Sequence, residues 1–184
     1  MSHPLAPISD AAWPAQIADM RGGFAGQLNV YRVMAHHPEL LRAWTDLRMH
    51  VVRNNALGPS RAEVVILRLG HRLGCAYEWN QHVIRALDIG LEKARIASLR
   101  GPLEAMAPED AVLAGAVDKL LAEHKLPERL YTDLQDLVGR AGCIDLMATV
   151  GMYLTLGFLL QTSGAPLDTD IAERLQRDAP ELMA

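Results

Sequence analysis

The sequence has few cysteines, few aromatic residues and no large excess of charge, and each shortage excludes a class of protein. Two cysteines in 184 residues cannot make a disulfide framework, and in a reducing compartment they remain thiols. A net charge of −4 and a pI of about 5.9 provide no basic field, so we expect no nucleic-acid partner. The composition, 50% hydrophobic and 22% charged, is that of a single globular domain.

Signals for secretion and membrane insertion are also missing. Residues 1–7 contain neither a basic n-region nor an apolar h-region, so we expect no secretory signal and a cytoplasmic location. Residues 146–160 are uncharged and mostly apolar, but these 15 residues are fewer than the roughly 20 that a span needs. We expect a core helix here, or one covered by a second subunit, and no membrane insertion.

Strand signals are rare, whereas apolar residues recur at helical spacing almost throughout the chain. The pattern predicts an all-α fold, a helical bundle. Ser60 is the expected N-cap of the helix that starts at Arg61. The predicted helices cover residues 10–20, 27–36, 38–54, 61–73, 91–99, 108–124, 127–140, 144–161 and 168–176, and one more runs from after Gly74 to about Gly90.

An internal repeat relates two parts of the chain. Six residues recur 68 positions later, namely Pro59, Arg61, Leu69, Arg72, Gly74 and Cys75 as Pro127, Arg129, Leu137, Arg140, Gly142 and Cys143. We expect each copy to be a helix-turn-helix hairpin. The polar residues Glu63, Glu78 and His82 of the first copy are replaced by Tyr131, Leu146 and Val150 in the second. The hairpin therefore does not need these polar groups to fold, which favours a role in chemistry.

Four ionisable side chains gather at the start of the helix that follows Gly74. Cys75, Glu78 and His82 are three and four residues apart, so they share one helical face, with Tyr77 beside them. The flanking residues are apolar, which predicts a buried helix, and burying charge is costly unless the charge is paired. These four residues are candidates for a functional site.

Each candidate also has a purely structural interpretation. Glu63 stands three residues after Ser60, the spacing of a capping box, so it serves either the cap or the site. Glu78 and His82 would contribute only about 0.3–0.5 kcal/mol as an exposed helical pair. Tyr77 is also typical of a core tyrosine with a satisfied hydroxyl, and Cys75 of a small buried hydrophobe.

The spacing of Glu63, Cys75, Tyr77 and His82 resembles that of the carboxymuconolactone decarboxylase family, which includes alkyl hydroperoxidase D. Redox members of the family carry a second cysteine at the position of Glu78, whereas decarboxylase members have Glu and then His four residues later, as here. The resemblance runs from about Asn29 to Leu167. It includes Asn29-Val30-Tyr31-Arg32, His37-Pro38 and Gly151-Met152-Tyr153.

The resemblance implies an alkyl hydroperoxidase D-like fold and a domain over residues 27–167. Residues 1–26 would form an N-terminal extension and residues 168–184 a C-terminal tail. It also implies a homo-oligomer, whether dimer, trimer or hexamer. No cofactor is expected. No metal is expected either, because a zinc site needs three or four ligands and the Glu78–His82 pair has no companions at ligand spacing.

The favoured hypothesis is a cofactor-free decarboxylase that acts on a small carboxylated lactone or β-oxo acid. His82 would move the proton, Glu78 would fix its tautomer, and Glu63 or Tyr77 would complete the relay. Three arginines are candidates for holding a substrate carboxylate, and spacing does not choose among them: Arg68, Arg72 and Arg85.

Two alternatives stay open. In a thiol peroxidase, Cys75 would act as the thiolate, helped by His82 and Glu63, and Cys143 or an external thiol would resolve the sulfenic acid. Repulsion from the neighbouring Glu78 would raise the pKa of that thiol and work against this role. The third hypothesis is a non-catalytic protein that binds a small molecule or supports an assembly.

Overall fold

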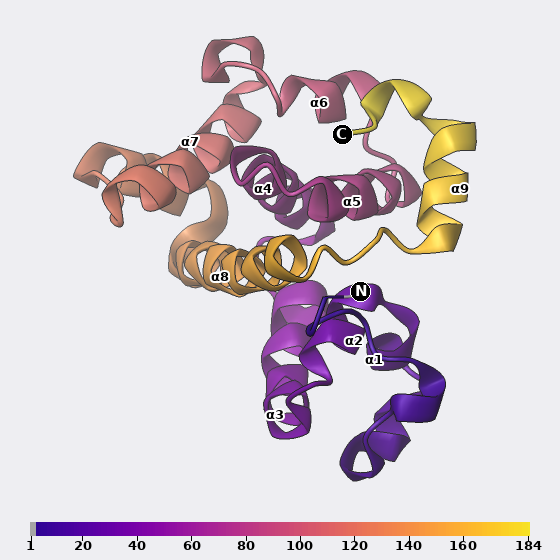
Figure 1. Ribbon diagram of the computed structural model, residues 1–184. Coiled ribbons are helices and arrows are strands. Elements are labelled where there is room, and N and C mark those ends of the chain that lie inside the picture. Colours follow the sequence, from indigo (N-terminus) through magenta and orange to yellow (C-terminus); the bar gives the residue numbers. More distant parts are fainter. Residues whose placement is uncertain (1–2) are drawn as a thin grey trace.

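The computed structural model describes residues 3–184 and shows helices and no β-strand within that range (Figure 1). The predicted all-α fold is confirmed. The α-helices are α1 (Phe24–Gln27), α2 (Asn29–Met34), α3 (Pro38–Met49), α4 (Pro59–Arg72), α5 (Ala76–Asp88), α6 (Lys93–Ser98), α7 (Pro108–Glu123), α8 (Glu128–Ser163) and α9 (Thr169–Asp178). The shorter turns are η1 (Asp10–Ala12), η2 (Ala15–Met20), the π-helical η3 (His50–Asn54), η4 (Leu103–Ala105) and η5 (Pro180–Leu182).

The hairpin of α4 and α5 lies at the centre of the molecule. Helices α7 and α8 pack against α4, and α9 packs against α5. Helix α8 crosses between this hairpin and the N-terminal helices α1 to α3, which lie on its other side (Figure 1). The candidate residues on α4 and α5 are therefore surrounded by helices, as a largely buried site requires.

Glycines set the geometry of the central hairpin. Helix α4 begins with Pro59 in its first turn, where proline loses no hydrogen bond, and Gly58 before it has a φ of +77°. Gly74 supplies the left-handed residue that ends α4, with a φ of +62°. A side chain at Gly70 would place its Cβ 3.1 Å from the backbone nitrogen of Trp79, so glycine allows α4 and α5 to approach closely.

The predicted N-cap at Ser60 is wrong. The cap position belongs to Gly58, because Pro59 starts the helix earlier than expected, and no side chain caps it. The hydroxyl of Ser60 instead accepts a hydrogen bond of 3.4 Å from Arg95. No capping box forms, so Glu63 is available for another contact.

The second copy of the repeat differs from the expected hairpin. Helix α8 is broken at Gly139, which has a φ of 71° and a ψ of 173°, whereas Gly142 stays helical. A Cβ at Gly142 would lie 2.6 Å from the Cβ of Val138, so the chain before the break folds tightly over this glycine. Leu146 and Val150, the counterparts of Glu78 and His82, are core residues of 0% and 6% exposure.

The first two predicted helices are each divided in the structure. Pro14 separates η1 from η2, and the extended Leu28, with a φ of −109° and a ψ of 128°, separates α1 from α2. The predicted helix over 38–54 forms, with η3 as its last part. Local breaks of this kind change the path of the chain without changing the fold class.

Helix α8 is long and apolar enough, by length and composition, to cross a membrane. Its most apolar stretch has a mean hydropathy of 1.8, and 56% of that stretch is buried inside the molecule. The core helix of a helical bundle has the same properties, so α8 is weak evidence for a membrane span.

The C-terminal residues pack against α5. The indole nitrogen of Trp79 donates a hydrogen bond of 2.7 Å to the carbonyl oxygen of Leu182, and the side-chain oxygen of Asn80 accepts one of 3.0 Å from the backbone of Ala184. These contacts join the last residues to the central hairpin. The division into 1–26, 27–167 and 168–184 stays a prediction.

Candidate active site

His82 lies between two carboxyl groups that come from different helices. Its Nδ1 is 2.6 Å from Oε2 of Glu63 on α4, and its Nε2 is 3.5 Å from Oε2 of Glu78 one turn earlier on α5. The ring of Tyr153 from α8 meets the imidazole edge to face, with 5.1 Å between the ring centroids. The structure therefore brings together three of the predicted site residues.

These three side chains are well shielded from solvent. The exposed fraction is 2% for the side chain of His82, 5% for Glu78 and 14% for Glu63. A buried imidazole flanked by two carboxyl groups is not the exposed helical pair of the structural interpretation. Glu63 had two possible roles, in a helix cap or in the site. Its carboxylate bonds to His82 and not to a helix cap, so it belongs to the site.

Burial shifts the pKa values of Glu78 and His82, both on α5, in opposite directions. Burial raises the pKa of Glu78 to about 8, opposed by the positive charge of Arg85 and reinforced by the negative charges of Glu63 and Asp168. Burial also lowers the pKa of His82, although the neighbouring Glu63 attracts the protonated form. Near neutral pH, Glu78 therefore tends to hold a proton while the imidazole is neutral.

The distances assign different partners to the two ring nitrogens. The short contact to Glu63 favours a proton on Nδ1, which donates to that carboxylate and leaves the Nε2 lone pair facing Glu78. The geometry thus gives Glu63 the tautomer-fixing contact that we expected of Glu78. Glu78 faces the other nitrogen, and its Oε1 is buried without a hydrogen-bond partner in the described part of the chain.

Tyr77 has a partner other than His82. Its hydroxyl donates a hydrogen bond of 2.5 Å to Asp168 and lies 3.5 Å from the backbone nitrogen of Val30. The other oxygen of Asp168 accepts a hydrogen bond of 2.9 Å from the backbone of Asn29. Tyr77 therefore ties α5 to α2 and to the start of α9, and burial raises the pKa of its hydroxyl.

Cys75 is the N-cap of α5 and is 2% exposed. Burial raises the pKa of its thiol, which is the opposite of what a reactive thiolate needs. Cys143, the expected resolving residue, is buried as well, and both cysteines are free thiols. The expected stripe of Cys75, Glu78 and His82 thus supplies two polar groups to the site, and the thiol is enclosed in the core.

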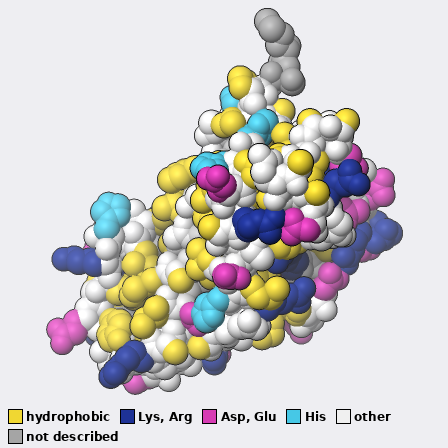
Figure 2. Space-filling view, turned by 90° about the horizontal axis from the view of Figure 1, so that it is seen from below, with side chains coloured by type: hydrophobic (Ala, Val, Ile, Leu, Met, Phe, Trp, Pro, Cys, Tyr) yellow, Lys and Arg dark blue, Asp and Glu magenta, His cyan; other side chains and the backbone are white. Residues whose placement is uncertain are grey.

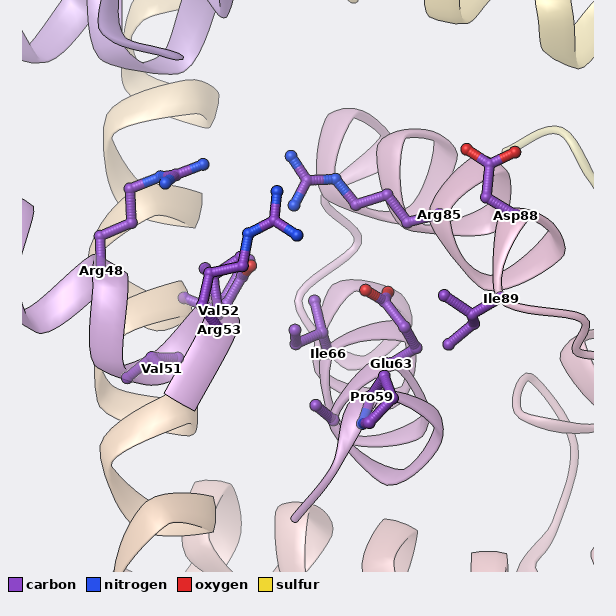
Figure 3. A pocket seen from close by; sticks show the side chains of 12 residues that line it. Arg48, Val51, Val52, Arg53, Pro59, Glu63, Ile66, Arg85, Asp88 and Ile89 are labelled. Atoms are coloured by element: carbon purple, nitrogen blue, oxygen red, sulfur yellow. The ribbon is translucent and has the colours of Figure 1, made fainter. Parts of the chain in front are cut away.

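Two cavities adjoin the His82 cluster. The larger has a volume of about 390 Å³ and is lined by Glu63 among others (Figure 3). The smaller, of about 20 Å³, is lined by Glu78, His82 and Tyr77 and is large enough for about one water molecule. Arg85 and Tyr153 line both cavities, so they form the wall between them.

The larger cavity also contains two arginines that sequence reasoning missed, Arg48 and Arg53. Of the three arginines proposed from the sequence, only Arg85 lies at the site. Arg68 and Arg72 both contact Asp118, at 2.6 Å and 3.3 Å, and Arg68 also donates to two backbone carbonyl groups. These contacts give Arg68 and Arg72 a structural role away from the His82 cluster.

Comparisons with known proteins agree with this fold. Residues 38–117, which include the His82 cluster, match the model of the Carboxymuconolactone decarboxylase family. The crystal structure of a variant of the debrominase Bmp8 in complex with 2,3,4-tribromopyrrole has a similar fold, with a TM-score of 0.73 and 13% sequence identity. The similarity covers 96% of this chain and 98% of that one. A search of curated proteins finds no significant match.

Proposed function

We propose that this chain, whose residues 38–117 match the model of the carboxymuconolactone decarboxylase family, is a cofactor-free enzyme that decarboxylates a small carboxylated lactone or β-oxo acid. One observation carries this proposal, namely the buried imidazole of His82 held between Glu63 and Glu78 beside a cavity of about 390 Å³. A cavity of this volume is within the range of small-molecule sites.

Decarboxylation leaves an electron pair on carbon, which must be delocalised into an enolate and then protonated. A protein needs a proton donor near neutral pKa for this step, and polar groups that stabilise the enolate. Glu78, with its pKa raised to about 8, meets the first requirement. Arg85, which lines both cavities, is placed to meet the second.

The proposed proton path runs from Glu78 through His82 to Glu63. Glu78 donates its proton to Nε2 of His82 while Nδ1 passes its own proton to Glu63, so the imidazole changes tautomer and stays neutral. Glu63 borders the larger cavity and delivers the proton to the substrate carbon. Tyr77, which we considered for this relay, takes no part in it because its hydroxyl is bonded to Asp168.

The test is carbon dioxide release from a panel of carboxylated lactones and β-oxo acids by the wild-type protein and a His82→Gln variant. The variant should lose activity by about 100-fold or more, because general acid–base catalysis is typically of that size. His71→Gln is the matched control, since His71 is an exposed histidine on α4. Activity of the His82 variant within a few-fold of wild type would refute the proposal.

We further propose that the protein is a homo-oligomer. Large apolar side chains are exposed on α8, where Ile144 is 62% and Phe158 is 58% exposed. Figure 2 shows apolar side chains gathered on the face seen from below. Burying such side chains against a second copy would contribute favourable free energy.

A further inference from the structure

We propose that Asp145 on α8 is a positioning residue that holds the η3 wall of the larger cavity, formed by Val51, Val52 and Arg53, in the place that substrate binding needs. The inference rests on the proposed function and deepens it, because it names a residue outside the cavity lining that controls the affinity for substrate. It depends on two hydrogen bonds of the Asp145 carboxylate, on where they meet the chain and on the internal repeat.

The η3 wall limits the larger cavity on one side. Its residues lie opposite Arg85 of α5, and Glu63 of α4 lies between the two sides (Figure 3). The space that a ligand can occupy therefore depends on where η3 lies relative to α5. Helix η3 is π-helical, and π-helical turns are rare in proteins and frequently occur at functional sites.

The carboxylate of Asp145 bonds to the chain at both ends of the η3 wall. A carboxylate only accepts hydrogen bonds, so Nε2 of His50, the first residue of η3, donates to its Oδ1 over 2.7 Å. The backbone nitrogen of Ala56, which follows η3, donates to its Oδ2 over 2.6 Å. Asp145 is 8% exposed. Hydrogen bonds to a charged acceptor are stronger than those between neutral groups, so these two contacts should hold the segment firmly.

The other side-chain hydrogen bonds of this segment are local. Within residues 3–184, those of Asn55 connect only residues of the range 51–58. Val51 and Leu57 are core residues of 1% and 3% exposure, whereas the residues between them are half-buried or exposed. Asp145 therefore supplies the polar contacts that join this segment to α8, and they fix its orientation between the two buried side chains.

The internal repeat supports a positioning role. Asp145 stands 68 residues after Tyr77 and is its counterpart in the second copy. Tyr77 also reaches a distant segment, since its hydroxyl bonds to Asp168 and lies 3.5 Å from the backbone nitrogen of Val30. Both copies thus use this position, with different side chains, to contact one side chain and one backbone N–H group of other segments.

Loss of the Asp145 contacts should weaken substrate binding without changing the chemical step. The groups of the proton path are on α4 and α5 and are held by contacts with one another, not with Asp145. If the η3 wall occupies its place for only a fraction of the time, the apparent dissociation constant rises by the inverse of that fraction. KM should therefore rise while kcat is retained, which is the kinetic sign of lost binding.

Hydrogen exchange measured by mass spectrometry tests the hold on the η3 wall without any substrate. In Asp145→Ala, the amides of residues 50–58 should exchange about tenfold or more faster than in wild type, because two hydrogen bonds to a charge are lost. Exchange in α5 should be unchanged. His50→Ala, a change at a side chain that is 52% exposed, removes one of the two bonds and should act in the same direction. Asp133→Ala, at an exposed position of α8, is the matched control.

Steady-state kinetics of the same variants separate positioning from a purely structural role. On a substrate from which wild type releases carbon dioxide, Asp145→Ala should raise KM about tenfold or more and leave kcat within a few-fold. Asp145→Asn should return KM to within about threefold of wild type, because its amide can accept the bond from Ala56 and donate to the ring of His50. Faster exchange of residues 50–58 with unchanged KM would show that Asp145 is only structural and would overturn the inference.

The exposed His50 keeps the test decisive if Asp145→Ala does not fold. In that case, unchanged exchange of residues 50–58 in His50→Ala would overturn the inference, and faster exchange with a raised KM would support it.

Failure of this inference can be told apart from failure of the proposed function. If exchange responds as described but wild-type protein releases no carbon dioxide from any of the panel, the positioning of the η3 wall by Asp145 stands and the function is wrong. If turnover depends on His82 but Asp145→Ala changes neither exchange nor KM, the function stands and the positioning role is wrong.

Discussion

Nδ1 of His82 lies 2.6 Å from the carboxylate of Glu63, a residue 19 positions earlier on the adjacent helix of the central hairpin. The contact crosses from α5 to α4, so it exists only when the hairpin is folded. It links the most buried group of the candidate site to the one carboxylate of the cluster that borders the larger cavity.

Replacing Glu63 with Gln should reduce turnover strongly while leaving the fold intact. The amide can still accept a hydrogen bond from Nδ1, but it cannot take up and release a proton, so we expect a loss of about 100-fold or more in kcat. Steady-state kinetics together with the far-ultraviolet circular dichroism spectrum would measure both effects. Glu104→Gln, at an exposed position, is the control. Unchanged kcat in the Glu63 variant would exclude this carboxylate from the proton path.

The stability of the protein should depend on pH through Glu78. Its pKa rises from an ordinary value of 4.5 to about 8 on folding, so the folded state binds the proton more tightly. This contribution is fully present below about pH 4.5 and is lost as the pH rises through about 8, by at most about 1.4 kcal/mol per pH unit.

A Glu78→Gln variant lacks this titration. The stability of wild type relative to the variant should therefore fall as the pH rises over this window. Urea denaturation of both proteins between about pH 5 and about pH 9 would measure the difference. A difference that stays constant across the window would show that Glu78 has the same pKa in the folded and unfolded protein.

Cys75 should be unreactive in the folded protein. Its thiol is buried and its pKa is raised, so little thiolate is present and oxidants have poor access to it. Mass spectrometry after mild peroxide treatment should find Cys75 reduced, and Cys75→Ala should retain decarboxylase activity within a few-fold. Rapid, selective oxidation of Cys75 that reductant reverses would instead support the thiol peroxidase.

Tyr77 should affect stability more than catalysis. Tyr77→Phe removes the hydrogen bond to Asp168 and leaves a buried carboxyl oxygen without this donor, which should cost about 1–3 kcal/mol. Thermal unfolding would measure the loss, and kcat should stay within a few-fold of wild type. Tyr131→Phe, a change of the same kind at a half-buried position on α8, is the control. A large loss of kcat with unchanged stability would instead indicate that Tyr77 takes part in proton transfer.

The exposed apolar residues of α8 should hold copies of the chain together. Phe158→Asp places a charge where a second copy would bury an aromatic ring, so it should dissociate the oligomer. Light scattering coupled to size-exclusion chromatography would report the mass of each protein. Thr155→Asp adds the same charge at another exposed position of α8 without removing an aromatic ring. Comparing the two variants shows whether charge alone dissociates the oligomer or whether loss of the Phe158 ring is also needed. A wild-type monomer at micromolar concentration would contradict the homo-oligomer.

Much of the fold follows from local patterns in the sequence. Helical periodicity predicted the all-α class, and Gly74 marked the turn between α4 and α5 because only a left-handed residue ends the helix there cheaply. The break in α8 was misplaced because Gly139 and Gly142 are both glycines. Helical periodicity alone does not choose between them, and the structure places the break at Gly139 and keeps Gly142 in the helix, where a Cβ would clash with the side chain of Val138.

The candidate site was predictable in part for the same reason. Glu78 and His82 are one turn apart on a single helix, so their proximity follows from spacing. The role of Glu63 was ambiguous because its spacing from Ser60 is also that of a capping box. The partner of Tyr77, Asp168, lies 91 residues away, so that contact has no periodic signature. Arg53 in η3 and Arg85 in α5 line the same cavity from different parts of the chain, which spacing along one helix does not predict either.

The enclosure of His82 has a consequence for the order of events in each cycle. Its imidazole touches Glu63 on one side and Glu78 on the other, and the space beside Glu78 admits about one water molecule. Once Glu78 has given up its proton, it can be protonated again only slowly while a ligand fills the larger cavity. Reprotonation of Glu78 should therefore follow release of the product, and proton exchange with bulk solvent would then limit how fast the next turnover begins.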